Sequence, residues 1–491
     1  MNEQPISAAV LAQYPRPDEA AIDAALAAEA AANDRKIIVL DDDPTGVQTV
    51  HDVRVYTDWS LESLRKGFAE ENKLFFILTN SRGFTVAETT RAHTEIAENV
   101  DAVAKEFGRD YLIISRGDST LRGHYPLETG LLRKVAWEKA GRVTDGEILC
   151  PYFKEGGRFT LNDVHYVRYG DELVPCGQTE FAGDETFGYR SSNLCEYVAE
   201  KTLGAYPKES VRSISLESLR AMDFDGIEKM LLRVKNFDKV VVNAIDDCDV
   251  KVFAVALYRA MNKGKNFTIR CAAALVKAIG NISTRPLLRR ADMVTLTSDA
   301  GGIIVVGSHT KKTTAQLEEL KKLPDIGFIE MNSDLVLTPG ALETETARIV
   351  AKAGALITAG KTVCISTKRQ VLTLPGDTPE AALRRSVRIS DALQSCVGCL
   401  PVTPAFVVAK GGITSSDVGT KALRVQCALV LGQIAPGVPV WRTGAESRFP
   451  GTPYVIFPGN VGEPTTLREA VQVLMGEGGT EAIRIRVSSG K

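Results

Sequence analysis

Short apolar runs alternate with longer amphipathic stretches along most of the chain. The first clear case is the run 36–43 (KIIVLDDD), which is apolar until it ends in three carboxylates. An apolar run of this length is typical of a strand that is buried on both faces of a parallel sheet. The stretch 85–108 instead has the spacing of a helix. Strands and helices in alternation predict α/β architecture.

The same pattern predicts the other main elements. In the first half we expect further strands at 73–81, 110–118, 147–153 and 239–247, helices at 18–34, 127–140 and 250–262, and a hairpin at 165–175. In the second half we expect strands at 301–309, 327–331, 362–366 and 405–412, and helices at 311–323, 341–359, 378–400, 415–425 and 465–475. So many strands exceed one ordinary sheet, and the pattern breaks near 285–300. We therefore predict two domains, 1–290 and 291–491, each with a mostly parallel sheet flanked by helices.

Composition and charge narrow the class of protein. The 491 residues are 44% hydrophobic and 24% charged, which excludes a fibrous or wholly disordered chain. A formal net charge of −2 provides no overall field for nucleic acid or an anionic membrane, so neither is an expected partner. No uncharged apolar run is long enough to span a membrane. Nine scattered cysteines without a signal peptide predict reduced thiols and a cytoplasmic location.

The residues that follow the predicted strands carry the candidate chemistry. Open α/β sheets bind ligands beyond the carboxyl ends of their strands. In the first half these ends hold carboxylates and arginines, which suit a polar, acidic small molecule. In the second half they hold glycines and hydroxyl groups before helix starts, which suit phosphate.

Residues 41–46 (DDDPTG) place three carboxylates after the first buried strand. Adjacent carboxylates repel one another, so we expect a metal, a cationic side chain or a hydroxyl-rich substrate beside them. One alternative is a plain acidic loop that caps the next segment. Another is the haloacid-dehalogenase phosphatase pattern, which Asp41-x-Asp43 and a second acidic segment after a later strand, 246–247, together resemble. That interpretation gives no role to 118–123 or to the glycine-rich second half.

Residues 115–124 (SRGDSTLRGH) form the densest polar segment. Its two arginines can clamp a carboxylate with paired donors, and its two glycines allow close approach of the backbone. Three weaker candidates follow other strands of the first half: Arg82, Arg158 and His165.

Three glycine-rich strand ends in the second half are candidates for phosphate binding. In the clearest, 409–417 (AKGGITSSD), a strand leads into paired glycines and hydroxyl groups. Similar segments occur at 307–314 (GSHTKKTT) and 457–464 (FPGNVGEP). Backbone N–H groups of such loops bind anions, so together the three segments favour a nucleotide.

These motifs resemble those of the four-carbon acid sugar kinase family over nearly the whole chain. The family patterns DDxTG, SR, DSTLRG, GR-x-T…HYV, GG-x-TS and GN-x-GEP occur at 42–46, 81–82, 118–123, 157–167, 411–415 and 459–464. The chain departs from the family in carrying Lys410 before the paired glycines, Ile413 where many relatives carry Glu, and Pro458 where others often carry Ser after Lys.

The resemblance implies an ATP-dependent kinase, a phosphotransferase with an alcohol group as acceptor. Family members phosphorylate the terminal hydroxyl group of threonate, erythronate or 3-oxo-tetronate. The N-terminal domain would hold the sugar acid, the C-terminal domain would hold ATP with Mg²⁺, and the active site would lie in the interdomain cleft.

The resemblance and the strand-end argument together give the candidate residues. The catalytic candidates are Asp42, Asp43 and Asp118. The candidates for substrate binding are Arg82, Ser119, Thr120, Arg122, Arg158 and His165. The candidates for cofactor binding are Ser308, Gly411, Gly412, Thr414, Ser415, Gly459 and Asn460. Which aspartate is the base, which residues touch the metal and which acid is the substrate stay open, as do a homodimer and a non-catalytic nucleotide-responsive binding protein.

Overall fold

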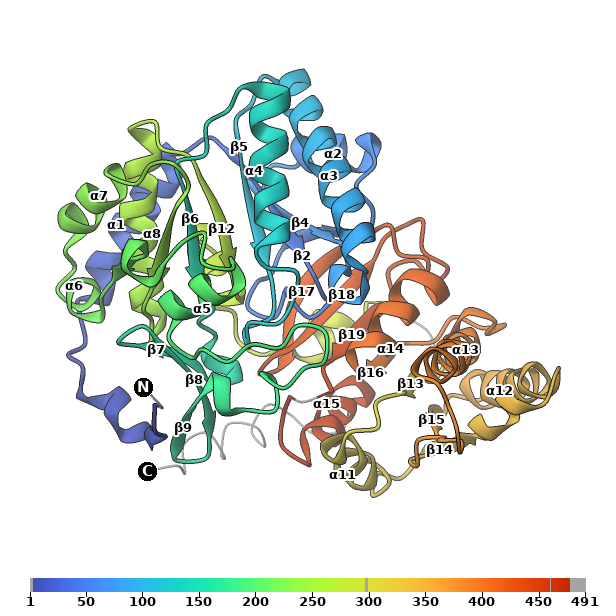
Figure 1. Ribbon diagram of the computed structural model, residues 1–491. Coiled ribbons are helices and arrows are strands. Elements are labelled where there is room, and N and C mark those ends of the chain that lie inside the picture. The colour runs from blue at the N-terminus through green and yellow to red at the C-terminus, as the bar shows by residue number, and fades with distance from the viewer. Residues whose placement is uncertain (1–2, 296–298, 460, 477–491) are drawn as a thin grey trace. The chain divides into compact units, whose positions relative to one another are not determined.

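The computed structural model describes residues 3–295, 299–459 and 461–476, in two compact units (Figure 1). Unit 1 comprises Met1–Gly46 and Asp58–Thr284, and unit 2 comprises Val47–Thr57 and Arg285–Lys491. The domain boundary predicted from the sequence places residues 47–57 in the first domain. The segment belongs to unit 2 because β3 (Val53–Tyr56) pairs antiparallel with β17 (Cys427–Ala435). The two-domain α/β architecture is confirmed.

Unit 1 contains a parallel sheet of strands that are almost entirely buried. Its order is β10 (Arg212–Ile214), β11 (Asp238–Val242), β6 (Gly146–Cys150), β12 (Phe267–Cys271), β5 (Tyr111–Arg116), β2 (Lys36–Asp41) and β4 (Leu74–Leu78). The chain passes from β2 to β4 on one side and then to β5 on the other side of β2. Such a reversal opens a crevice at the carboxyl ends of the strands, so the segments after β2 and β5 are placed to form a site.

Helices flank this sheet (Figure 1). They are α1 (Glu19–Ala32), α2 (Leu61–Ala69), α3 (Val86–Phe107), α4 (Leu127–Ala140), α5 (Leu194–Lys201), α6 (Leu216–Arg220), α7 (Phe224–Leu232), α8 (Asp247–Asn262) and α9 (Ala273–Ile279). Helices α2, α3 and α4 pack in sequence against one another, and α8 packs against α1, α7 and α9. A small antiparallel sheet with the order β1 (Ile6–Ser7), β9 (Glu172–Pro175), β8 (Val164–Tyr169) and β7 (Arg158–Leu161) confirms the predicted hairpin.

The sheet of unit 2 is mixed. From β3 it continues antiparallel through β17, β18 (Val438–Thr443) and β19 (Pro453–Phe457), and then parallel through β16 (Val407–Lys410), β13 (Ile303–Val306), β15 (Thr362–Thr367) and β14 (Ile326–Met331). Its helices are α10 (Arg290–Met293), α11 (Lys311–Leu320), α12 (Ala341–Thr358), α13 (Pro379–Gly398), α14 (Gly412–Asp417) and α15 (Thr466–Met475). Strands β13, β16 and β19 are neighbours, so their carboxyl ends meet.

Most predicted elements are present, with two instructive differences. The helix expected at 415–425 begins three residues earlier, at Gly412, and ends in a π-helical turn at Val418–Ala422. The sequence pattern also did not predict β12, whose apolar run is interrupted by Arg270. None of the helices within the described residues combines the length and apolarity needed to cross a membrane.

Candidate functional site

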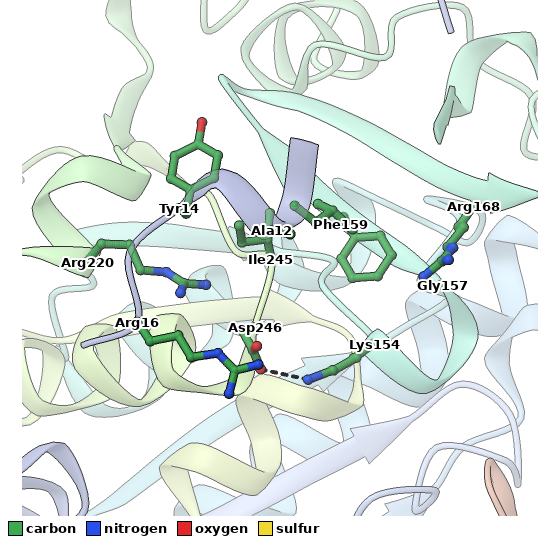
Figure 2. Close-up of a pocket in the computed structure, with 11 residues that line it drawn as sticks. Ala12, Tyr14, Arg16, Lys154, Gly157, Phe159, Arg168, Arg220, Ile245 and Asp246 are labelled. Atoms are coloured by element: carbon green, nitrogen blue, oxygen red, sulfur yellow. Dashed lines mark hydrogen bonds and ion pairs between the residues drawn. The ribbon is translucent and has the colours of Figure 1, made fainter. Parts of the chain in front are cut away.

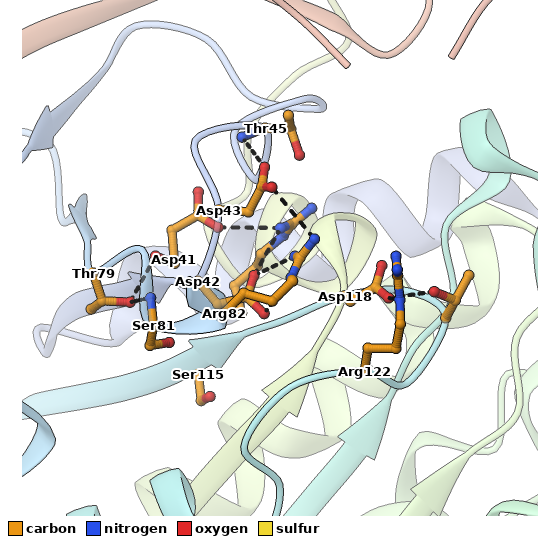
Figure 3. A network of polar contacts seen from close by, with 12 residues as sticks. Asp41, Asp42, Asp43, Thr45, Thr79, Ser81, Arg82, Ser115, Asp118 and Arg122 are labelled. Carbon is orange, nitrogen blue, oxygen red and sulfur yellow. Dashed lines mark hydrogen bonds and ion pairs between the residues drawn. The ribbon is translucent and has the colours of Figure 1, made fainter. Parts of the chain in front are cut away.

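Three consecutive aspartates at the end of β2 lie close to two arginines from the flanking segments, and Figure 3 shows one of these, Arg82, beside Asp42 and Asp43. Arg82 Nη2 lies 2.6 Å from Asp42 Oδ1, and its Nη1 lies 3.4 Å from Asp43 Oδ2. Arg116 Nη1, at the end of β5, lies 3.2 Å from Asp41 and 3.6 Å from Asp42. Because β4 and β5 flank β2, their ends bring both guanidinium groups to the carboxylates. The structure thus supplies the cations that the acidic run requires.

The aspartates of this cluster differ in protonation. Burial raises the pKa of Asp41 to about 8, an effect that its pairing with Arg116 only partly offsets. Burial also acts to raise the pKa of Asp43, but Arg82 and hydrogen bonds from Thr45 hold it below its ordinary value. At neutral pH Asp43 is therefore an ionised hydrogen-bond acceptor, whereas Asp41 is largely protonated.

Asp118, in the loop after β5, is a second ionised acceptor of the site (Figure 3). Its Oδ2 accepts a hydrogen bond from Arg122 Nε at 2.7 Å and another from the Thr120 hydroxyl group. Burial acts to raise the pKa of Asp118, but Arg82 and Arg122 lower it well below its ordinary value. The pKa of Arg82 is raised in turn by the carboxylates around it, so Arg82 links Asp118 to the aspartates after β2.

The two glycines of this loop make room for an arginine of the protein itself. A Cβ atom at Gly117 would lie 2.1 Å from the Arg270 guanidinium, and one at Gly123 would lie 2.6 Å from it. Arg270 Nη1 donates to Ser115 Oγ at 3.0 Å and to Glu128 Oε2 at 2.7 Å. Arg270 is not among the residues that the sequence motifs predict for this site. An arginine inside an otherwise apolar strand was the available signal, because a buried charge requires a partner.

Arg158 is the cation of this region that has no carboxylate partner among the described residues. Its Nε atom is buried without a hydrogen-bond partner. The guanidinium carbon lies 5.5 Å from the centre of the Phe181 ring, and that of Arg122 lies 5.1 Å from the same ring. Burial lowers the pKa of Arg158, and the nearby charge of Asp118 acts in the opposite direction. A partly buried guanidinium group without a carboxylate partner is suited to receive an anion.

His165 has a different place from the one expected. Its side chain is fully buried, with Nδ1 2.9 Å from the Thr160 hydroxyl group and Nε2 2.8 Å from the Ser119 carbonyl oxygen. Burial lowers the pKa of His165 to about 4, so the ring is neutral at pH 7. Both ring nitrogens are occupied, which corrects the expectation of direct substrate contact. His165 instead holds the loop that carries Asp118.

In unit 2 the loops after β13, β16 and β19 converge. The Thr313 hydroxyl group lies 2.9 Å from Ser308 Oγ and 3.3 Å from the Gly459 carbonyl oxygen. A Cβ atom at Gly411, where φ is +118°, would lie 3.0 Å from the Ser308 Cβ atom. Three of the expected cofactor residues, from three different strand ends, are therefore neighbours.

The other expected cofactor residues have mixed positions. Gly412 is the first residue of α14. Thr414 packs closely against Gly307, since a Cβ atom added at Gly307 would lie 2.2 Å from Thr414 Oγ1. Ser415 Oγ is buried and donates to the Ala409 carbonyl oxygen at 3.0 Å, so its hydroxyl group stabilises the loop. Asn460 lies outside the described residues.

Two basic side chains to which the sequence analysis gave no role adjoin these loops. Lys410 is fully buried, donates to the Pro458 carbonyl oxygen and lies 4.2 Å from the centre of the Phe457 ring. Burial lowers its pKa to about 7. Arg369, which follows β15, donates to the Ser308 carbonyl oxygen, and its Nη1 atom is buried without a hydrogen-bond partner. The site therefore has cationic groups for an anionic ligand.

Two family models match consecutive parts of this chain. A sugar-binding N-terminal domain matches residues 37–279, and a nucleotide-binding C-terminal domain matches residues 303–467. The first contains the aspartate cluster, and the second contains the glycine loops. The chain belongs to the four-carbon acid sugar kinase family.

Solved structures share the fold. A Haemophilus influenzae protein assigned to a domain family of unknown function is 17% identical, with 89% of this chain and 100% of that chain covered and a TM-score of 0.58. A Salmonella typhimurium protein provisionally named a tRNA synthase is 14% identical, with 88% and 98% covered and a TM-score of 0.65. No curated protein matches the chain. At these identities the likeness supports the fold alone.

Proposed function

We propose that this protein is an ATP-dependent kinase that phosphorylates the terminal hydroxyl group of a four-carbon sugar acid of the threonate, erythronate or 3-oxo-tetronate class. The observation that carries the proposal is Arg158, a partly buried guanidinium group without a carboxylate partner in the described residues, whose Nε atom is buried without a hydrogen bond and whose charge interacts with that of Asp118. A hydroxylated acid satisfies both kinds of group. Its carboxylate would pair with Arg158, and its hydroxyl groups would donate to the ionised aspartates.

We propose different roles for the aspartates, because their hydrogen-bond partners differ. Asp42 is committed to Arg82 through two hydrogen bonds and fixes that guanidinium group. Asp43 and Asp118 are the ionised acceptors, and one of them would take the proton of the attacking hydroxyl group. The hydroxyl oxygen then bonds to the γ-phosphorus of ATP as the bond to the bridging oxygen breaks and ADP leaves.

The nucleotide would bind at the converging loops of unit 2. Backbone groups at Gly411 and Gly459 and the hydroxyl group of Ser308 would face its phosphates, with Arg369 adding a positive charge. Magnesium, the usual partner of ATP, neutralises charge on the phosphates when bound. No group of three His, Cys, Asp or Glu side chains within the described ranges is arranged to hold a metal ion, so we propose that Mg²⁺ is held mainly by phosphate and water oxygens.

The haloacid-dehalogenase alternative is less well supported. It requires Asp41 to attack phosphate as an ionised nucleophile, but Asp41 is buried, paired with Arg116 and largely protonated at neutral pH. The second acidic segment of that alternative, at 246–247, is engaged elsewhere, since Asp246 pairs with Lys154.

The test is ADP formation from ATP and Mg²⁺ across a panel of four-carbon sugar acids, with folding of the protein checked by circular dichroism. We expect turnover with at least one acid and none with the matching neutral polyols. Phosphate release from sugar phosphates without ATP would support the phosphatase. Ligand-dependent thermal shifts without turnover would support a binding protein, and either result would overturn the kinase.

A further inference from the structure

We propose that unit 1 has a second binding site, for a small organic anion that carries a carboxylate or phosphate group. The site is a pocket of about 370 Å³ beyond the carboxyl ends of β6 and β11 (Figure 2). Pockets for small molecules begin at about 300 Å³. The proposal does not depend on the kinase activity.

The pocket exists because the N-terminal segment is fixed over it. Ile6 and Ser7 pair with Leu173 and Glu172 of β9, which anchors one end of the segment. The other end is held where Arg220 Nη1 of α6 donates to the Pro15 carbonyl oxygen at 3.1 Å. The segment between these anchors contributes Leu11, Ala12, Tyr14 and Arg16 to the pocket. A segment to which the motif analysis gave no role therefore completes a wall.

The lining of the pocket has a surplus of positive charge. Lys154 is balanced by Asp246 at 2.8 Å, and Arg220 is balanced by Asp249 at 2.6 Å. Two further guanidinium groups are not balanced in this way. Arg16 has no hydrogen-bond or ion-pair partner in the part of the chain that the structure describes.

The second of these groups is Arg168. Its Nη2 atom lies 4.0 Å from Asp171, whose side chain is fully exposed, so the pairing is weak. Its Nε atom donates to the Gly170 carbonyl oxygen at 2.8 Å, which leaves its charge uncompensated by any close carboxylate of the described residues. Two guanidinium groups without a strong ion pair at one concave surface are suited to carboxylate or phosphate, which accept paired N–H donors.

The apolar part of the lining indicates an organic ligand rather than a bare ion. Tyr14 enters from the N-terminal segment and Phe159 from β7, and Figure 2 shows both rings at the pocket. Aromatic walls stabilise the carbon part of a ligand, while the guanidinium groups select its charge.

The pocket is distinct from the aspartate site. Successive side chains of a strand point to opposite faces, so Phe159 points away from the face of Arg158 and Thr160. Thr160 contacts His165, and His165 contacts the Ser119 carbonyl oxygen, so that face of β7 belongs to the loop that carries Asp118. Phe159 therefore marks a separate surface on the opposite side of the strand.

The test uses isothermal titration of the full chain with phenyl phosphate, phenylacetate and inorganic phosphate. We expect at least one of the two aromatic anions to bind, and phenyl phosphate to bind more tightly than inorganic phosphate. Comparison of phenyl phosphate with phenylacetate shows whether the site prefers a phosphate or a carboxylate group. Absence of binding by both aromatic anions, or equal affinity for phenyl and inorganic phosphate, would overturn the proposal.

Variants locate the binding. The double variant Arg16→Gln/Arg168→Gln should weaken it about tenfold or more, because both charges are removed without touching a buried ion pair. Arg91→Gln, an exposed change on α3, is the matched control and should bind as the wild type does. Asp118→Asn should also retain binding. An unaffected double variant, or loss of binding in Asp118→Asn, would place the anion elsewhere and refute the second site.

Discussion

The Nε atom of Arg122 lies 2.7 Å from Oδ2 of Asp118, four residues earlier in the same loop. The pair keeps Asp118 ionised and fixes its orientation. If Asp118 receives the substrate hydroxyl group, Asp118→Asn should lower kcat by about 10²–10⁴, with a smaller change in KM. Steady-state ADP formation measures this.

The matched control for this change is Asp184→Asn. Asp184 Oδ2 lies 3.7 Å from Nη1 of the same Arg122 side chain, whereas Asp118 accepts from its Nε atom. Its loss removes a neighbouring charge without removing the proposed acceptor, so kcat should change little. Equal effects of the two substitutions would show that Asp118 acts only through the charge of Arg122.

Arg158→Gln should raise KM for the sugar acid by about ten- to a hundredfold, because a charged hydrogen bond to the carboxylate is lost. Turnover of a neutral four-carbon polyol, if measurable at high concentration, should be unchanged, since it has no carboxylate to lose. A fall in kcat with KM unaltered would contradict the assignment.

The lowered pKa of the buried His165 should make the stability of the protein depend on pH. Its pKa is about 4 in the folded protein and about 6.5 when unfolded. The unfolded chain therefore binds more protons between these values, so stability is lost as the pH falls from 6.5 towards 4, by roughly 3 kcal/mol at pH 4 from this group. His165→Gln can keep both hydrogen bonds and lacks the titration. Urea denaturation at pH 7, 5.5 and 4.5 should show the wild type losing more stability, and parallel losses would exclude His165 as the cause.

Gly117→Ala should destabilise the protein by about 3 kcal/mol or more, because the new Cβ atom would displace the buried Arg270 guanidinium from Glu128. Gly130→Ala on α4 is the control. A Cβ atom there meets nothing within 4 Å, and alanine favours a helix over glycine by up to about 1 kcal/mol. Chemical denaturation should show a lower free energy of unfolding for Gly117→Ala and a higher one for Gly130→Ala. An unchanged free energy of unfolding in Gly117→Ala would show that the loop can relax around the methyl group.

The apolar runs were sufficient to predict most strands, because burial on both faces leaves a local signal such as that of 36–43. The strand ends likewise pointed to Asp43 and Asp118 without any knowledge of their neighbours. The pairing of β3 with β17 and the contact of Arg270 with the two glycines depend on residues far apart in sequence. The periodicity of apolar residues carries no information about such contacts. It also does not reveal that His165 is buried, which is the feature that makes His165 a positioning residue.

Lys410 provides a test of the loops expected to hold the nucleotide. Its buried ammonium group has a pKa of about 7, below the value of about 10.4 expected in the unfolded chain. Between these values the unfolded chain binds more protons, so the contribution of Lys410 should make the protein more stable as the pH rises, by roughly 2 kcal/mol from pH 7 to 9. Lys410→Met should abolish this gain, whereas Lys352→Met, an exposed change on α12, should retain it.

Because the Pro458 carbonyl oxygen loses its donor in Lys410→Met, KM for ATP should also rise while KM for the acid stays constant. A variant with the wild-type pH profile and unaltered KM for ATP would show that Lys410 neither titrates in this range nor positions the loop at Gly459.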